Sequence, residues 1–474
     1  MRVNKVLNTS VIYNHKVNKI CNDSRIVEEG DIFFAINGTH SNGEDFIQDA
    51  INKGAKTIVT EHYDLELKFL GNIVIVKDSR RELANALRRF YKSKTKKMKF
   101  IGVTGTNGKT TTTTLIYKYL RYLNINCSLI GSNGMFVNDD FYETINTTPD
   151  INLIYDMIDK SYHHKCKYVI LEVSSHAIKQ LRVTGIDFSV VLFTNLTLDH
   201  LDFHKDFIDY KYTKGMLLTH VDEKNTVILN ADSEYYEFYK NLVKAKLVTY
   251  GVNDSDYWIN NIELNEANSI FKLVFKNENI SVKTNLIGMF NVYNVTSFIS
   301  IIDTLKLYRK EISGFLSTNI VIPGRMEEIK FNDRRVIIDY AHTPDGVFNV
   351  LSFLKTMKKN IILVVGCGGS RDKTKRSVIG QISVDNSNYV IFTSDNPRDE
   401  DERKIIDQIV VNIEKENYEI IVDRYEAIKK AILISKPDDI IAILGRGNEQ
   451  FQKVKDKLIP LNDIQVVKEI IRGM

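Results

Sequence analysis

One segment of the chain has the residue types and spacing to bind the phosphates of a nucleotide. Positions 101–115 read IGVTGTNGKTTTTTL, in which a buried-strand pattern ends at Thr104 and a helix is expected to follow. Glycines let successive backbone N–H groups face an anion, and a helix N-terminus adds partial positive charge. Lys109 can reach the β- and γ-phosphates, and the Thr110 hydroxyl suits Mg²⁺. We predict an ATP site that contains Gly105, Thr106, Asn107, Gly108, Lys109, Thr110 and Thr111.

This segment departs from the full GxxxxGK[ST] pattern, because Val103 stands where the first glycine is required. The alternative is a glycine-rich turn between a strand and a helix, with a lysine that faces solvent. We favour nucleotide binding because the strand, the glycines, the Lys-Thr pair and the helix coincide.

Two further polar groups follow predicted strands. Glu172 lies in LEVSSHAIKQLRV, and His200 lies in FTNLTLDHLDFH just after the next strand. Open α/β sheets place ligands at the carboxyl ends of their strands, so both side chains are expected at the phosphate crevice. A carboxylate and an imidazole beside a triphosphate suit a divalent cation. We predict a metal site of Thr110, Glu172 and His200; a structural role is the alternative for His200 and is favoured for His176 and His204.

The elements that position these groups follow a βαβ pattern, because short β-branched runs alternate with longer helical stretches. We predict an α/β protein of three domains. A basic run at 92–97, read as a solvated linker, and the turn at Pro323-Gly324 suggest domains at 1–96, 97–322 and 323–474. Buried strands are expected at 99–104, 168–173, 189–194 and 226–229 in the second domain, and at 335–339, 361–365, 389–393 and 440–444 in the third.

The composition is that of a globular protein, with 43% hydrophobic and 26% charged residues among 474. A net charge of +4 does not favour a nucleic-acid or polyanionic-membrane partner. The N-terminus lacks the apolar segment of a secretion signal, and no apolar run reaches the ~18 residues of a membrane span. The four cysteines form no CxxC pair, which fits a reducing compartment. We expect a cytoplasmic protein that is a monomer.

Considered together, GTNGKT, EVSSHAIKQLRV, FTNLTLDHLDFH, PGRME, DYAHTPD and GCGGSRDKTKR resemble the Mur ligase family, and the matches run in order over nearly the whole chain. The resemblance implies a UDP-binding α/β domain, a central P-loop ATPase with a parallel sheet, and a Rossmann-like C-terminal domain. It also implies an ATP- and Mg²⁺-dependent ligase of peptidoglycan precursor synthesis. Such an enzyme activates the D-glutamate carboxylate of UDP-N-acetylmuramoyl-L-alanyl-D-glutamate as an acyl phosphate and joins it to an amine.

The resemblance also implies roles for individual residues. Lys109, Glu172 and His200 are joined as catalytic residues by Lys214, which the family carries as a carbamylated N6-carboxylysine. Further ATP contacts come from Asn291, Asn294, Arg325 and Asp339. Contacts to the UDP-sugar peptide come from Asn22, Ser24, His40, Ser41, Asn42, Asn146, Thr147, Thr148, Ser174, Gln180 and Arg182. Without the resemblance, the UDP-binding residues are interpreted as ordinary polar loop residues, Lys214 as a lysine on a helix, and Arg325 as a member of a surface ion pair.

The amino-acid pocket implied by the resemblance contains a DNPR segment typical of members that add meso-diaminopimelate. A guanidinium fork at Arg398 can bind the distal carboxylate of that amino acid, and Glu449 can pair with its distal ammonium. L-Lysine is the alternative substrate, because GRGNE stands here where the family usually has GKGHE. The pocket residues implied are Arg371, Asp395, Asn396, Pro397, Arg398, Gly445 and Glu449.

Two other functions are kept open. One is a folate polyglutamate ligase of the same superfamily, against which the NDSR and DNPR segments speak. The other is a P-loop protein that uses ATP as a conformational switch, against which Glu172, His200 and Lys214 speak. The switch would release phosphate without an amino acid, whereas a ligase requires it.

Overall fold

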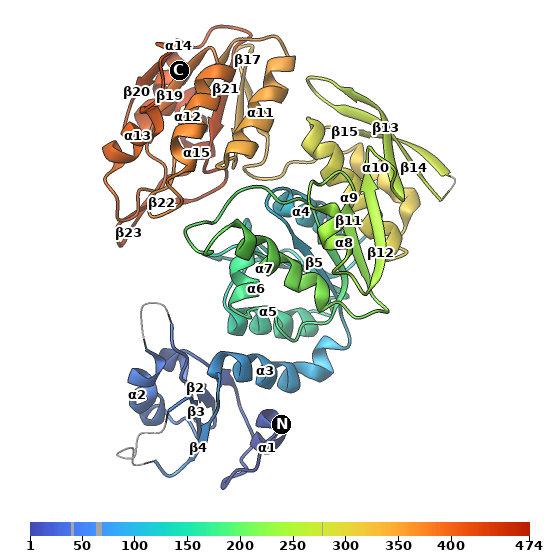
Figure 1. Ribbon diagram of the computed structural model, residues 1–474, viewed down its shortest axis with the longest axis vertical. Helices are drawn as coiled ribbons and strands as arrows, with labels where there is room; N and C mark the ends of the chain where they lie inside the picture. The colour runs from blue at the N-terminus through green and yellow to red at the C-terminus, as the bar shows by residue number, and fades with distance from the viewer. Residues whose placement is uncertain (39–41, 63–68, 277) are drawn as a thin grey trace.

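The computed structural model describes residues 1–38, 42–62, 69–276 and 278–474. Three α/β domains follow one another along the long axis of the molecule, with the N-terminal domain at the bottom of Figure 1 and the C-terminal domain at the top. The predicted fold class is confirmed. The domain boundaries at 96/97 and 322/323 stay predictions; they fall in the connections between α3 and β5 and between α10 and β16.

The first domain is built on a parallel sheet of short strands in the order β1-β2-β3-β4. Helix α3 begins after Asp78, whose carboxylate caps it by accepting from the Arg81 N–H. The helix runs from the first domain to the second. The elements are α1 (Val3–Leu7), β1 (Ile20–Cys21), η1 (Ser24–Ile26), β2 (Ile32–Phe34), η2 (Gly43–Phe46), α2 (Ile47–Asn52), β3 (Thr57–Thr60), β4 (Asn72–Ile75) and α3 (Ser79–Thr95).

The basic run at 92–97 is not a linker, which corrects the prediction. Its first four residues form the last turn of α3. Lys94 pairs with Asp159 of α5, and Lys97 donates to the Tyr162 hydroxyl at 3.2 Å. Tyr91 of α3 also packs on Tyr155 of α5 with ring centroids 5.3 Å apart. The run therefore holds the first domain against the second.

The central sheet has the order β15-β14-β13-β12-β11-β10-β5-β9-β6-β7-β8 in the described residues. Its β13 to β6 part is parallel, and antiparallel strands extend both edges. The strands are β5 (Lys99–Thr104), β6 (Cys127–Gly131), β7 (Gly134–Val137), β8 (Asp140–Tyr142), β9 (Tyr168–Glu172), β10 (Phe188–Phe193), β11 (Thr226–Asn230), β12 (Lys246–Gly251), β13 (Tyr257–Leu264), β14 (Ser269–Phe275) and β15 (Glu278–Thr284).

Helices cover both faces of this sheet because successive residues of β5 point to opposite sides. Ile101 and Val103 are buried with α4 and α9, whereas Phe100 is buried with α3, α5 and α7. The helices are α4 (Lys109–Tyr122), α5 (Ile151–His163), α6 (Ser175–Lys179), α7 (Phe207–Thr219), α8 (Tyr236–Lys240), α9 (Met289–Thr304), η3 (Arg309–Glu311) and α10 (Ile312–Leu316).

The C-terminal domain has the sheet order β16-β17-β21-β18-β19-β20, with only its β16–β17 edge pair antiparallel among the described strands. Its helices also lie on both faces. The elements are β16 (Glu327–Phe331), β17 (Arg334–Asp339), α11 (Pro344–Thr356), β18 (Ile361–Val365), α12 (Lys375–Asn386), β19 (Tyr389–Phe392), α13 (Glu402–Val410), β20 (Tyr418–Ile420), α14 (Arg424–Ile434), β21 (Ile440–Leu444), β22 (Phe451–Val454), β23 (Lys457–Pro460) and α15 (Asp463–Arg472).

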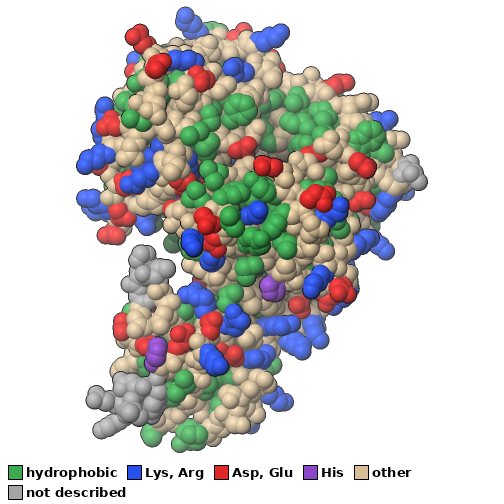
Figure 2. Space-filling model, viewed as in Figure 1, with side chains coloured by type: hydrophobic (Ala, Val, Ile, Leu, Met, Phe, Trp, Pro, Cys, Tyr) green, Lys and Arg blue, Asp and Glu red, His purple; other side chains and the backbone are tan. Residues whose placement is uncertain are grey.

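Every predicted strand is present, and its ends differ from the prediction by at most one residue. The predicted strands at 99–104, 361–365 and 440–444 match β5, β18 and β21. None of the helices in the described ranges is both long enough and apolar enough to cross a bilayer. On the face in Figure 2, the surface is hollowed between the first and third domains, and acidic and basic side chains are interspersed.

Candidate active site

The predicted phosphate loop joins β5 to α4, and two of its positions accept only glycine. Gly105 has φ +137° and Gly108 has φ +86°. A Cβ at Gly105 would lie 1.9 Å from the Thr194 hydroxyl, and a Cβ at Gly108 would lie 2.4 Å from the Asn294 side-chain oxygen. The loop is therefore packed tightly against β10 and α9, and α4 begins at Lys109 with its N-terminus at the loop.

Lys109 lies over this loop. Its Nζ donates to the carbonyl oxygens of Gly105 at 2.9 Å and Thr106 at 2.8 Å. Burial lowers the pKa of Lys109, although the charges of Glu172 and Asp199 oppose that shift. The hydrogen bonds of this ammonium are to neutral carbonyl oxygens, so a phosphate at this point would add a negative charge in direct contact with it.

Thr110 and Glu172, two members of the predicted metal site, are in direct contact. The Thr110 hydroxyl donates to Glu172 Oε2 at 2.9 Å and accepts from Arg325 Nη2 at 3.0 Å. Glu172 is 1% exposed and also accepts from the backbone N–H and the hydroxyl of Ser132, at 3.0 and 3.1 Å. Ser132 was missed in the sequence because it meets Glu172 only through the pairing of β6 with β9.

His200, the third member, follows β10 at the same edge of the sheet. Its Nε2 lies 3.3 Å from Asp199 Oδ2, and burial lowers its pKa well below the ordinary value, although the charge of Asp199 opposes that shift. The described residues contain no group of three or more His, Cys, Asp or Glu side chains placed to hold a metal ion. Mg²⁺ keeps waters and phosphate oxygens as ligands, so a hydroxyl and a carboxylate beside the phosphate loop suit it.

Asp199 is a site residue that the sequence did not single out. It is 5% exposed, and two basic side chains of the C-terminal domain face it: the Lys375 ammonium, with Nζ at 3.7 Å, and the His342 imidazole, with Nε2 at 3.8 Å. Burial alone would raise the pKa of Asp199, but the charges of His200, Lys375 and His342 outweigh it and hold the pKa below its usual range. The carboxylate thus stays ionised where the second and third domains meet.

A cavity of about 610 Å³ lies between these domains. The phosphate loop and His200 line it from the central domain, and Asp345 of α11 accepts from the Asn107 side chain across it at 3.0 Å. Four further predicted ATP contacts line the same cavity: Asn291, Asn294, Arg325 and Asp339. Asn294 donates to Asn291 at 3.1 Å, and Asp339 accepts from the Met326 and Ala341 N–H groups at 2.8 Å each.

Lys214 of α7 is 1% exposed, and its Nζ donates to the Gly105 carbonyl at 2.7 Å. This is the carbonyl that Lys109 also uses. Burial and the Lys109 charge lower the pKa of Lys214 well below the ordinary value, despite the opposing charge of Asp199. Lys214, which the sequence by itself indicates only as a lysine on a helix, is therefore a buried amine at the phosphate loop.

His176 and His204 have structural surroundings, as expected. His176 stacks on Phe203 with ring centroids 3.9 Å apart, and burial lowers its pKa to about 4. His204 Nδ1 lies 3.1 Å from Asp209 Oδ2.

Most of the residues predicted for the acceptor peptide converge next to Glu172. The Thr148 hydroxyl donates to the Glu172 carbonyl at 2.7 Å, and its oxygen lies 3.2 Å from the Ser174 hydroxyl oxygen. Arg182 donates to the Thr148 carbonyl at 2.7 Å and to Gln180 Oε1 at 2.6 Å. The Thr147 hydroxyl oxygen lies 3.0 Å from that of Ser132, whereas Asn146 is exposed.

The predicted UDP-binding residues lie on loops of the first domain. Asn22 accepts from Asn152 at 2.7 Å, so its side chain is used in a contact with the central domain. Ser24 is buried in η1, and Asn42 caps η2 by accepting from the Glu44 N–H. His40 and Ser41 lie outside the described residues.

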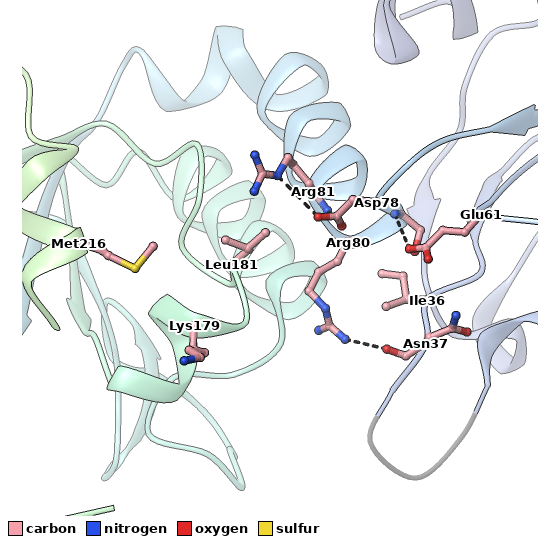
Figure 3. A pocket seen from close by; sticks show the side chains of 10 residues that line it. Ile36, Asn37, Glu61, Asp78, Arg80, Arg81, Lys179, Leu181 and Met216 are labelled. Carbon is pink, nitrogen blue, oxygen red and sulfur yellow. Dashed lines mark hydrogen bonds and ion pairs between the residues drawn. The ribbon is translucent and has the colours of Figure 1, made fainter. Parts of the chain in front are cut away.

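A cavity of about 370 Å³ opens between the first and central domains, and Lys179 and Leu181, the sequence neighbours of Gln180 and Arg182, line it. Figure 3 shows Arg80 at the start of α3, where its guanidinium donates to the Asn37 carbonyl, and Lys179 and Leu181 on the other side of the gap. Burial lowers the pKa of Arg182, and the Arg80 charge lowers it further, so the two cations act on one another.

The residues predicted for the amino-acid pocket lie at and beyond the carboxyl ends of β18, β19 and β21. Glu449 accepts from Asn396 Nδ2 at 2.6 Å and from the Tyr340 hydroxyl at 3.2 Å. Gly445, with φ +112°, allows Asp395 to approach, because a Cβ there would lie 2.7 Å from Asp395 Oδ2. Pro397 packs its carbonyl on Gly369, where a Cβ would lie 1.9 Å from that oxygen.

Both predicted pocket arginines lie near Gly368. Arg398 Nη1 donates to the Gly369 carbonyl at 2.8 Å, and it would lie 2.8 Å from a Cβ at Gly368. The Cγ of Arg371 would lie 3.7 Å from the same Cβ, and the Arg371 guanidinium pairs with Asp202 of the central domain at 2.9 Å. Arg446, which departs from the family pattern, is fully buried and donates to Asn396 and to the Leu461 carbonyl. Arg446 therefore connects its own loop to Asn396 and to the segment that follows β23.

Known proteins of one family match this chain over almost its whole length. Three family models match: Mur ligase family, catalytic domain at 16–95; Mur ligase middle domain at 103–302; and Mur ligase, glutamate ligase domain at 324–447. A Bacillus cereus protein described as UDP-N-acetylmuramoyl-L-alanyl-D-glutamate–2,6-diaminopimelate ligase is 37% identical, covering 97% of this chain and 95% of its own. A Clostridium botulinum protein of the same description is 37% identical, covering 99% and 98%. A solved structure so described is 28% identical with a TM-score of 0.71, covering 100% and 99%.

Proposed function

Because this chain belongs to the Mur ligase family, whose members are ATP-dependent ligases, we propose that it joins meso-diaminopimelate to the D-glutamate carboxylate of UDP-N-acetylmuramoyl-L-alanyl-D-glutamate. This reaction belongs to peptidoglycan precursor synthesis. The observation that carries the proposal is the cavity between the second and third domains. The phosphate loop lines it together with Thr147, one of the residues predicted for the acceptor, and Tyr340, whose hydroxyl donates to Glu449.

The first step transfers the γ-phosphoryl group from ATP to the D-glutamate carboxylate and releases ADP. Two anions must approach one another, so electrostatics and positioning carry the step. Lys109 and Arg325 supply positive charge at the phosphates, and Arg182 orients the acceptor. Mg²⁺, held by Thr110 and Glu172, would offset further charge on the phosphate oxygens when bound.

In the second step the neutral amine of the amino acid attacks the acyl carbon. The new C–N bond forms, inorganic phosphate leaves with the electrons of the C–O bond, and the amine gives up a proton. No covalent enzyme intermediate is needed. The amino acid approaches from the C-terminal domain, where the buried Glu449 lies, and the ionised Asp199 of the central domain faces that domain through Lys375.

The choice of amino acid follows from the charges in the pocket. Diaminopimelate carries a distal carboxylate and ammonium, which match Arg398 and Glu449. L-Lysine, the alternative, lacks the carboxylate and would leave Arg398 without an anion. A buried unpaired charge of this kind costs about 2–5 kcal/mol, so diaminopimelate is favoured. A monomeric state and a cytoplasmic location stay predictions.

The direct test supplies the purified protein with ATP, Mg²⁺ and the UDP-sugar dipeptide, with diaminopimelate or lysine in parallel. We expect phosphate release only with both acceptor and amino acid, and a product mass equal to the acceptor plus diaminopimelate minus water. Equal or better use of lysine would overturn the choice of amino acid. Phosphate release without an amino acid would instead support the switch.

We also propose that Lys214 is carbamylated. Only a neutral amine reacts with CO₂, and burial favours that form by lowering the pKa of Lys214. The carbamate keeps one N–H, which can still donate to the Gly105 carbonyl. Its new negative charge would offset the nearby Lys109.

Carbamylation of Lys214 should depend on pH in a defined direction. Acidification protonates the amine and removes the reactive form, so the carbamate should decline as pH falls and return as pH rises. We expect a carbamate ¹³C resonance after incubation with ¹³C-bicarbonate, and its loss in Lys214→Met. A signal that persists at full strength in Lys214→Met would contradict the assignment.

A further inference from the structure

Two loops of the C-terminal domain, one serving the nucleotide and one the amino acid, are packed backbone against backbone. Gly324 precedes Arg325, and Gly447 precedes Glu449 by two residues. A Cβ at Gly324, which has φ +65°, would lie 2.1 Å from the Asn448 nitrogen. A Cβ at Gly447, with φ +53°, would lie 2.7 Å from the Gly324 carbonyl oxygen. Neither loop can shift far without moving the other.

Tyr340 connects the side chains of the same two loops. The Arg325 guanidinium lies over the Tyr340 ring, 4.2 Å from its centroid. The Tyr340 hydroxyl donates to Glu449 Oε1 at 3.2 Å. The Glu449 charge and burial raise the pKa of Tyr340, so the hydroxyl stays protonated and keeps donating.

The chain of contacts reaches a ligand site at both ends. Arg325 donates to the Thr110 hydroxyl at the phosphate loop, at 3.0 Å. Glu449 accepts from Asn396 of the amino-acid pocket at 2.6 Å. Between these ends there is one cation–π contact and one hydrogen bond, and both belong to Tyr340. Hydrogen-bonded groups in a protein interior polarise and fix one another.

This inference rests on the proposed function. We propose that Tyr340 is a positioning residue that couples amino-acid binding to the contact of Arg325 with the nucleotide. An amino-acid ammonium at Glu449 stabilises the ionised carboxylate and fixes the Tyr340 hydroxyl. The fixed ring then holds Arg325 against the phosphate loop. Amino acid and nucleotide therefore tighten one another's binding, by the same factor in both directions.

The test measures this factor with the full-length protein and a non-hydrolysable ATP analogue, with Mg²⁺ and the UDP-sugar dipeptide held constant. Calorimetry gives the Kd of the analogue with and without diaminopimelate, and the Kd of diaminopimelate with and without the analogue. We expect about fivefold or more tightening in the wild type. In Tyr340→Phe, which keeps the ring and loses the hydroxyl, we expect a factor below about twofold.

The matched control is Tyr257→Phe. Tyr257 also donates its hydroxyl to a carboxylate, Asp303 Oδ2, at 2.6 Å, but it lies on β13 away from the crevice. The melting temperature of Tyr257→Phe should fall about as much as that of Tyr340→Phe, while the coupling factor of Tyr257→Phe stays at the wild-type value. Full coupling in Tyr340→Phe, or equal loss in Tyr257→Phe, would overturn the inference. If neither diaminopimelate nor lysine binds the wild type, the proposed function fails and the coupling with it; if one binds without affecting the nucleotide, the coupling alone fails.

Discussion

Lys109→Ala is expected to lower kcat for phosphate release by at least about 10²–10³-fold. The ammonium of Lys109 rests on the Gly105 and Thr106 carbonyls, at the N-terminus of α4 where the phosphates would bind. In the reaction it would offset charge that moves onto the transferred phosphoryl group. Lys214 cannot take its place, because its Nζ is held on the Gly105 carbonyl, and Arg325 is already used at the Thr110 hydroxyl.

The variant should stay folded, which separates lost chemistry from lost structure. Burial lowers the pKa of Lys109, so the native protein already disfavours its charge. We expect a melting temperature within about 5 °C of the wild type. Lys118→Ala, on the same helix but outside the crevice, is the matched control and should retain its rate. Amide formation at full speed by Lys109→Ala would refute the proposed phosphate site.

Eight of the parallel strands and the phosphate loop could be predicted because their signals are local. β5 is a continuous apolar run, and the glycines and Lys-Thr pair that follow have steric and electrostatic reasons to be adjacent in sequence. The antiparallel edge was missed although β14 alternates buried and less buried residues, a period-two pattern that the sequence does contain. The basic run before β5 was misread because its charges hid the last turn of α3.

The missed site residues depend on distant parts of the chain. Ser132 reaches Glu172 only because β6 pairs with β9, although α5 separates them in sequence. Asp199 stands next to His200 in sequence, but its partners Lys375 and His342 come from the C-terminal domain. Tyr340 lies in the DYAHTPD motif, yet only the packing of Gly324 on the Gly447 loop shows what it connects. Such contacts have no local signature.

Arg398→Ala should raise KM for diaminopimelate about thirtyfold or more, the equivalent of at least about 2 kcal/mol. The guanidinium lies beside Gly368, and burial together with the Arg371 charge lowers its pKa. A desolvated cation of this kind gains most from a carboxylate that pairs with it. The KM for ATP should change little, because Arg398 is outside the residues that line the nucleotide cavity.

The comparison with lysine makes this prediction specific to the distal carboxylate. Lysine offers no such group, so its own kcat/KM should change much less, and the preference for diaminopimelate should collapse. Arg398→Lys keeps the charge but not the planar fork, and should recover only part of the loss. Arg403→Ala is the control: Arg403 pairs on the surface of α13 with Asp407 at 2.9 Å, a contact worth ~0–1 kcal/mol. Equal losses for both amino acids would mean that Arg398 only supports its loop through the Gly369 carbonyl, and an unchanged KM would remove it from the pocket.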